Sequence, residues 1–225
     1  LKVIHPHHRL CHHLVLSSCA GLHLDRNTRG NKMTLLSVKT NGPVTHLTMN
    51  APERLNALSD EMLAALQDRL DRIADDPDTR VVTLSGAGKA FCAGHDLRQM
   101  TAMRQDEDGG ATAFADLFAR CSTVMARIQS MPQPVIAQVH GIATAAGCQL
   151  VATCDMAVAA EGTRFGVNGV NIGLFCSTPM VALSRAIPRK QAFEMLTTGA
   201  FIDAGRAEAL GLINRVVAPD ALADE

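Results

Sequence analysis

Hydrophobic residues along most of the chain follow the period of a strand in some segments and the period of a helix in others. Residues 36–39 and 44–49 predict two short strands joined at Asn41-Gly42, a dipeptide typical of hairpin turns. Ser59 is expected to cap a helix, because the apolar residues after it keep helical spacing at Met62, Leu63, Leu66, Leu70 and Ile73.

Strands and helices continue to alternate after this helix. Residues 80–85 form a short apolar run that leads into a glycine-rich loop, and a long helix with one apolar face follows, ending at Pro132 and Pro134. Further strands are expected at 135–139, 156–159 and 213–217, with a helix opening in 141–155 and helices after Phe165. This order predicts an α/β fold in a single domain, residues 33–225.

The first 32 residues differ in composition from the rest. Six of the nine histidines fall between positions 5 and 23, and no acidic residue precedes Asp25. A His/Cys metal tract and a mitochondrial transit peptide are both open interpretations. The preferred one is a leader or disordered extension outside the fold, because the first strand pattern begins only at Met33.

Composition narrows the function classes. The formal net charge is −1, from 21 basic and 22 acidic residues, so a nucleic-acid partner is not expected. No apolar run approaches the roughly 18 residues that a membrane span needs. Seven cysteines without a CxxC pair predict free thiols in a reducing compartment and no metal site.

Five segments in sequence carry a resemblance to a known family. The chain resembles the enoyl-CoA hydratase/isomerase (crotonase) superfamily. The resemblance implies a ClpP-like spiral of ββα units that assembles into homotrimers or hexamers. It also implies an acyl-CoA thioester as substrate or ligand and a role in fatty-acid metabolism as a lyase or isomerase. No permanently bound cofactor is implied. Family members continue beyond the position of residue 225, so we expect the C-terminal helices to be truncated. The matching segments are NAPERLNALSDEM (50–62), GAGKAFCAGHDL (86–97), PVIAQVHGIATAAGCQLVATCD (134–155), FGVNGVNIGLFCSTP (165–179) and LTTGAFIDAGRAEALGLINRVV (196–217).

The resemblance implies an oxyanion hole made of two backbone N–H groups, those of His95 and Ala146. Such donors stabilise the enolate that forms when a thioester loses a group from its α-carbon, by roughly 3–4 kcal/mol each. Taken singly, each glycine-rich loop is more often only a tight turn. By resemblance, the CoA moiety is expected to contact Arg54, Leu55, Ala57, Ala93, Gly94, His95, Asp96, Leu97, Gly141 and Ala146.

Two catalytic glutamates of the hydratases fall on Gln149 and Gly169 here. Neither residue can exchange a proton near pH 7, which argues against ordinary hydratase activity. The imidazole of His95 and the thiol of Cys176 could replace them, although simple packing is the commoner role of such side chains. Asp96 is expected to cap a helix rather than to react.

Three functions stay open at this point. The first is an acyl-CoA enzyme that relies on enolate stabilisation, including one similar to methylmalonyl-CoA decarboxylases, whose AGHD loop this chain shares. The second is a non-catalytic acyl-CoA binder or regulator, and the third a scaffold that binds no CoA. A bacterial source would favour the cytoplasm, and a eukaryotic source the mitochondrial matrix.

Overall fold

The computed structural model describes residues 34–225, and the expected leader at 1–32 lies outside the described residues. The domain begins with the expected hairpin of β1 (Leu36–Asn41) and β2 (Val44–Met49), which pair antiparallel. Its turn falls at Gly42-Pro43, because Asn41 still pairs with Val44. Gly42 has φ +55°, a left-handed conformation that mirror-image hairpin turns require and glycine adopts at little cost.

Parallel strands extend this hairpin into a six-stranded sheet in the order β1-β2-β3-β4-β6-β9. The added strands are β3 (Val81–Gly86), β4 (Val135–Val139), β6 (Met156–Ala160) and β9 (Arg215–Val217). A second, smaller sheet contains β5 (Ile142–Thr144), β7 (Arg164–Gly166) and β8 (Ile202–Asp203). The sequence analysis did not predict these three short strands.

Successive turns of the chain form a spiral. One turn adds β4 to the large sheet and β5 to the small one, and the next turn adds β6 and β7 in the same way. Isolated bridges from Leu58 to His95 and from Cys92 to Ala143 continue the small sheet toward earlier turns. The α/β spiral expected from the resemblance is therefore confirmed.

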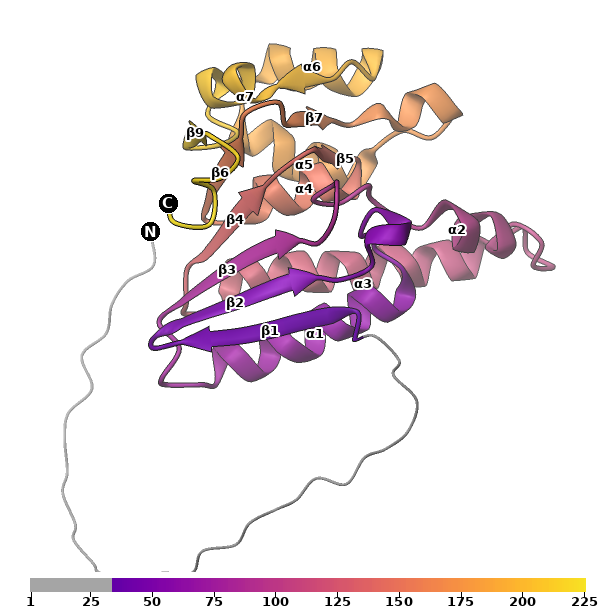
Figure 1. The fold of residues 1–225 in the computed structure, drawn as a ribbon. Coiled ribbons are helices and arrows are strands. Elements are labelled where there is room, and N and C mark those ends of the chain that lie inside the picture. Colours follow the sequence, from indigo (N-terminus) through magenta and orange to yellow (C-terminus); the bar gives the residue numbers. More distant parts are fainter. Residues whose placement is uncertain (1–33) are drawn as a thin grey trace, which may run out of the picture. The chain divides into compact units, whose positions relative to one another are not determined.

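Helices α1 (Asp60–Ala74) and α3 (Ala111–Ser130) pack against one another beside the first strands (Figure 1). The expected cap of α1 is present, since the Ser59 hydroxyl accepts a hydrogen bond from the Met62 N–H at 3.2 Å. The short helix α2 (Leu97–Met103) precedes α3 and is capped by Asp96, whose carboxylate accepts from the Arg98 N–H at 2.8 Å.

The later part of the chain is mostly helical, as the sequence predicts, and no described helix is long and apolar enough to cross a membrane. Two short 3-10 turns lie among the helices, η1 (Pro52–Arg54) and η2 (Asn168–Ile172). The helices are α4 (Ala146–Thr153), α5 (Ser177–Ala186), α6 (Arg189–Thr198) and α7 (Ala204–Leu210).

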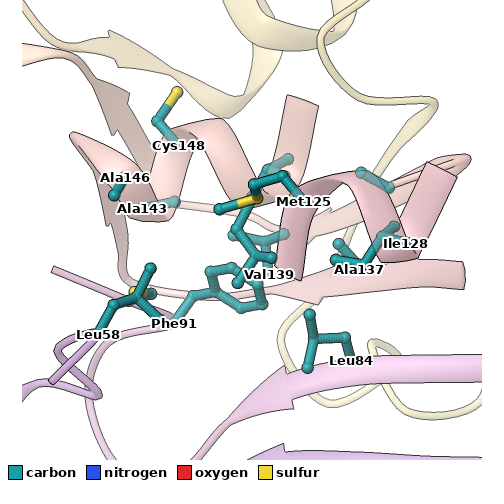
Figure 2. Close-up of a cluster of buried hydrophobic side chains, with 14 of the residues drawn as sticks. Leu58, Leu84, Phe91, Met125, Ile128, Ala137, Val139, Ala143, Ala146 and Cys148 are labelled. Carbon is teal, nitrogen blue, oxygen red and sulfur yellow. The ribbon is translucent and has the colours of Figure 1, made fainter. Parts of the chain in front are cut away.

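The hydrophobic core reaches the loops at the ends of the strands. Leu58 and Phe91 lie in loops and Ala143 is the middle residue of β5, and all three are fully or almost fully buried. Figure 2 shows them in one cluster with Ala146 and Cys148 from the start of α4. Because close-packed side chains resist displacement, this cluster holds the loop after β3 against the start of α4.

Candidate functional site

The loop after β3 approaches the start of α4 closely at Gly94. A Cβ placed on Gly94 would lie 2.9 Å from the Cβ of Ala145 and 3.2 Å from the backbone N of Ala146. Gly94 also has φ +88°, so a side chain is disfavoured there by conformation as well as by space. The absence of a side chain lets the backbone at Gly94, just before His95, approach the start of α4 at Ala146.

Ala145, which precedes α4, has a strained backbone. Its φ of 50° and ψ of −120° fall in a region that residues with a side chain rarely adopt. The Ala145 N–H donates to the Gly166 carbonyl at 2.9 Å, which fixes the peptide before the helix. The sequence analysis named small residues here but did not detect this strain.

Two backbone N–H groups at this contact are free. Among the hydrogen bonds of residues 34–225, none uses the N–H of His95 or of Ala146 as its donor. Ala146 is the first residue of α4, so its N–H has no acceptor within the helix and lies at the positive end of the helix dipole. Two free N–H groups near one contact are what the resemblance leads one to expect, and their role as an oxyanion hole stays a prediction.

Both residues line a cavity of about 170 Å³. It lies between the loop after β3, α2, α3, the start of α4 and the segment from η2 to α5. Apolar and neutral polar side chains make up its wall. The lining residues are Ala93, His95, Leu97, Met100, Phe118, Thr144, Ala145, Ala146, Asn168, Gly169, Ile172, Leu174, Phe175, Cys176, Ser177, Thr178 and Pro179.

A second hollow of about 250 Å³ adjoins the cavity, because Ala93, His95 and Leu97 line both. It collects most of the residues expected to contact CoA. Of these, Gly94 and Gly141 border neither hollow, and a Cβ on Gly141 would clash with the Lys89 carbonyl. The residues lining the second hollow are Glu53, Arg54, Leu55, Ala57, Ala93, His95, Asp96, Leu97 and Arg98.

The imidazole of His95 is buried against Phe118, with ring centroids 5.6 Å apart in an edge-on arrangement. Burial lowers the pKa of His95, and the neighbouring Leu58 backbone and the charge of Asp60 offset this only in part. Neither ring nitrogen has a hydrogen-bond partner of good geometry within the described part of the chain. The ring is therefore neutral at pH 7, with a donor and an acceptor available.

The two positions that carry glutamates in hydratases do not offer equivalents here. Gln149 is buried in α4 and does not border the cavity, and its side-chain oxygen has no partner among the described residues. Gly169 does border it, but a Cβ there would meet the Leu174 carbonyl and lie 2.8 Å from the Cys176 sulfur. The space beside Gly169 is thus already filled.

Cys176 lies at the N-terminus of α5 and lines the cavity wall. Burial raises the pKa of its thiol, so the sulfur is protonated at neutral pH. The five cysteines in the described residues are all free, and no group of three or more metal-ligating side chains occurs among those residues. A role for Cys176 in proton transfer stays a prediction.

Other charged and polar residues near the site have structural partners. Asp96 caps α2 and lies 3.6 Å from the Arg54 guanidinium, so its carboxylate is engaged in structure, as expected. His140 bonds the Gly88 carbonyl at 2.8 Å. Asn168 accepts from the Thr144 hydroxyl at 2.6 Å on the cavity wall.

Several cavity residues escaped the sequence analysis. Phe118 belongs to the apolar face of the long helix expected before Pro132, and Met100, Leu174 and Thr178 were not singled out. For Phe118 a signal existed, since its spacing from Cys121 and Met125 places it on the apolar face of α3. For the others, only the tertiary structure shows the location.

Comparison with known proteins supports the family resemblance that the sequence motifs indicated. A family model described as Enoyl-CoA hydratase/isomerase matches residues 39–225. Enoyl-CoA hydratase domain-containing protein 3, mitochondrial, from Xenopus laevis is 47% identical over 182 residues, which cover 81% of this chain and 60% of that protein. The human protein of the same name is also 47% identical over 182 residues, 81% of this chain and 58% of its own length. The chain spans less than two thirds of these two relatives.

Two solved structures support the same family resemblance. The crystal structure of an enoyl-CoA hydratase from Mycobacterium smegmatis superimposes with a TM-score of 0.81 at 56% identity, over 85% of this chain and 73% of that one. Human enoyl Coenzyme A hydratase domain-containing protein 3 gives a TM-score of 0.80 at 44% identity, over 85% and 74%. Because the family model and these relatives match most of its length, the chain belongs to the enoyl-CoA hydratase/isomerase family.

Proposed function

We propose that the protein binds an acyl-CoA thioester with its carbonyl oxygen between the N–H groups of His95 and Ala146, and that these donors stabilise the enolate. The observation that carries this proposal is the pair of free N–H groups at one cavity. Preorganised donors in a site shielded from water need no reorganisation when charge develops on the oxygen. The adjoining hollow at 53–57 and 93–98 is proposed for the CoA moiety.

Ordinary hydration of a double bond is not part of this proposal. Hydration needs one group to activate water and another to deliver a proton. Among the described residues, no carboxylate lines the cavity, and Gly169 has no room for one. The neutral imidazole of His95 and the thiol of Cys176 remain as candidates for proton transfer, and isomerisation asks less of them than hydration does, because one group can remove and return the proton.

The missing carboxylates also favour a second candidate, a non-catalytic acyl-CoA binder or regulator. This protein would use the same cavity and N–H groups without turnover. The vertebrate relatives are named as mitochondrial. Whether this chain acts in the mitochondrial matrix or in a bacterial cytoplasm stays a prediction that depends on its source.

An assembly of three or six copies is proposed as well. Exposed apolar side chains on α5 and α6, Met180, Val181 and Phe193, support it, since such clusters often mark protein interfaces. Light scattering on the purified protein tests this point, and a monomeric mass would contradict it.

The substitution Ala146→Pro tests the central proposal. Proline removes the N–H at the first position of a helix, which often accepts it. Because Gly94 lies close to the Ala146 nitrogen and the Ala145 backbone is unusual, circular dichroism first establishes that the variant is folded. We expect turnover of any accepted substrate to fall about 100- to 1000-fold, the effect of losing one oxyanion donor. Mass spectrometry with crotonyl-CoA, a 3-enoyl-CoA and methylmalonyl-CoA measures turnover, and calorimetry measures binding.

The matched control is Ala111→Pro, at the first position of α3 and away from the cavity lining. It should leave binding and turnover at the wild-type level. Binding without turnover in the wild type would select the regulator over the enzyme. Absence of acyl-CoA binding in the wild type, or unchanged turnover and binding in folded Ala146→Pro, would overturn the proposal.

A further inference from the structure

The cavity beside the two N–H groups carries no formal charge on its wall. Of the described residues that border it, none is Asp, Glu, Lys or Arg. The polar groups that remain are the amide of Asn168, the hydroxyls of Thr144, Ser177 and Thr178, and the Cys176 thiol. These can hydrogen-bond a ligand but cannot neutralise a charge.

His95 does not supply a positive charge either, because burial lowers the pKa of its ring and keeps it neutral at pH 7. The nearest cations belong to the adjoining hollow, where Arg54 and Arg98 form part of the lining. Arg54 lies 3.6 Å from the Asp96 carboxylate, which already balances its charge. A negative group inside the cavity would therefore lack an ionic partner.

Two helix ends favour negative charge there. Helices α4 and α5 both begin at the cavity, with Ala146 and Cys176 on the wall, and their N-termini carry partial positive charge. The end of α4 is proposed to act on the thioester oxygen, and the end of α5 offsets only a small part of the cost of removing a carboxylate from water. The uncharged wall therefore outweighs the helix dipole and disfavours any full negative charge in the cavity other than the one that develops on the thioester oxygen.

We propose that the cavity accepts uncharged, mainly aliphatic acyl groups and rejects acyl groups that carry a carboxylate near the thioester. The inference rests on the proposed acyl-CoA function and specifies its substrate class. It separates this protein from a methylmalonyl-CoA decarboxylase, with which it shares the AGHD sequence at 93–96. A carboxylate on the α-carbon lies beside the N–H pair and cannot extend from the cavity into water.

Propionyl-CoA and methylmalonyl-CoA form the decisive pair, because they differ by one carboxylate on the α-carbon. Calorimetry should give a dissociation constant for methylmalonyl-CoA at least about 100-fold higher than for propionyl-CoA, as expected for an unpaired, partly desolvated carboxylate. Equal affinities would overturn this inference and leave the proposed function standing. Absence of binding by either ester would instead overturn the proposed function.

A cation placed at the rim tests the cause. Phe175 lines the cavity and is 47% exposed, so Phe175→Lys adds an ammonium without burying it. The variant should bind methylmalonyl-CoA about tenfold more tightly than the wild type does, and propionyl-CoA no more tightly, because the new charge acts only on the carboxylate.

Val181→Lys is the matched control. Val181 is also 47% exposed and lies on α5, but it does not border the cavity. This variant should change neither affinity. If it strengthens methylmalonyl-CoA binding as much as Phe175→Lys does, or if Phe175→Lys strengthens both esters equally, the wall's neutrality is not the cause and the inference fails.

Discussion

Gly169 shows, at the scale of one residue, why one part of the cavity wall has no room for a carboxylate. The sequence shows only that a glutamate is absent there. The structure adds that the adjoining space holds the Leu174 carbonyl and the Cys176 sulfur. Restoring a carboxylate would therefore require the segment from η2 to α5 to move as well. His95 and Cys176 are the titratable side chains on the cavity wall, and burial favours the uncharged form of both.

The buried ring of His95 predicts a pH-dependent stability. Its pKa is lowered in the folded state, so between that value and the ordinary value near 6.5 the unfolded chain binds more protons. The contribution of the neutral, buried ring to the stability of the folded state is therefore complete above pH 6.5 and is lost as the pH falls toward the lowered pKa. The unfolding free energy of His95→Leu minus that of the wild type should therefore be larger at pH 5.5 than at pH 7.5.

Urea unfolding at the two pH values measures this difference. The carboxyl groups with lowered pKa values, Glu61, Asp76 and Asp108, are common to both proteins and titrate in a more acidic range. A constant difference in unfolding free energy between the variant and the wild type would contradict the assignment of a lowered pKa to His95.

At the scale of elements, the turn into α4 combines a close contact with local strain. Gly94 lets the loop after β3 approach, and Ala145 holds a backbone conformation suited to glycine. This conformation of Ala145 sets the direction of the Ala146 N–H, which an unstrained turn would direct elsewhere. Strain kept at a binding site is consistent with selection for geometry over stability.

Ala145→Gly should therefore stabilise the protein by about 1 kcal/mol. The relief of a strained conformation, of order 1–3 kcal/mol, exceeds the added flexibility of glycine in the unfolded chain, about 0.4–1 kcal/mol. The comparison is Ala152→Gly, a half-buried alanine inside α4, which should destabilise by roughly 0.5–1 kcal/mol. Equal losses of stability in urea unfolding would show that Ala145 is unstrained.

At the scale of the molecule, the spiral brings distant loops to one site. Parallel strands β3 and β4 end at the same edge of the large sheet, so the loop at 92–96 meets the start of α4 some fifty residues later. The same packing buries most of the cysteines. Burial raises the pKa of Cys92 and of Cys148 to about 12 and that of Cys121 to about 11.

Native thiol reactivity should reflect that burial. In a Cys11→Ser/Cys19→Ser variant, we expect iodoacetamide at pH 8 to leave Cys92, Cys121 and Cys148 unmodified over times in which the urea-unfolded chain is fully alkylated, since the thiolate is the reactive form. Peptide mass spectrometry locates the modified sites. Native labelling of Cys92 or Cys148 at the unfolded rate would contradict the packing of the core.

The sequence alone determined features that depend on near neighbours. Helical spacing of apolar residues predicted α1 and α3, and Ser59 and Asp96 were correctly expected as helix caps. These signals are local, because capping and amphipathic periodicity act within a few residues of the chain.

Only the tertiary structure decided the rest. Strands β5, β7 and β8 have two or three residues each, too few for a periodic pattern, and they exist because neighbouring turns supply partners. The strain at Ala145 and the filled space beside Gly169 likewise depend on atoms distant in sequence. The neutral cavity wall is built from several separate segments, and its charge balance is a property of their packing rather than of any one motif.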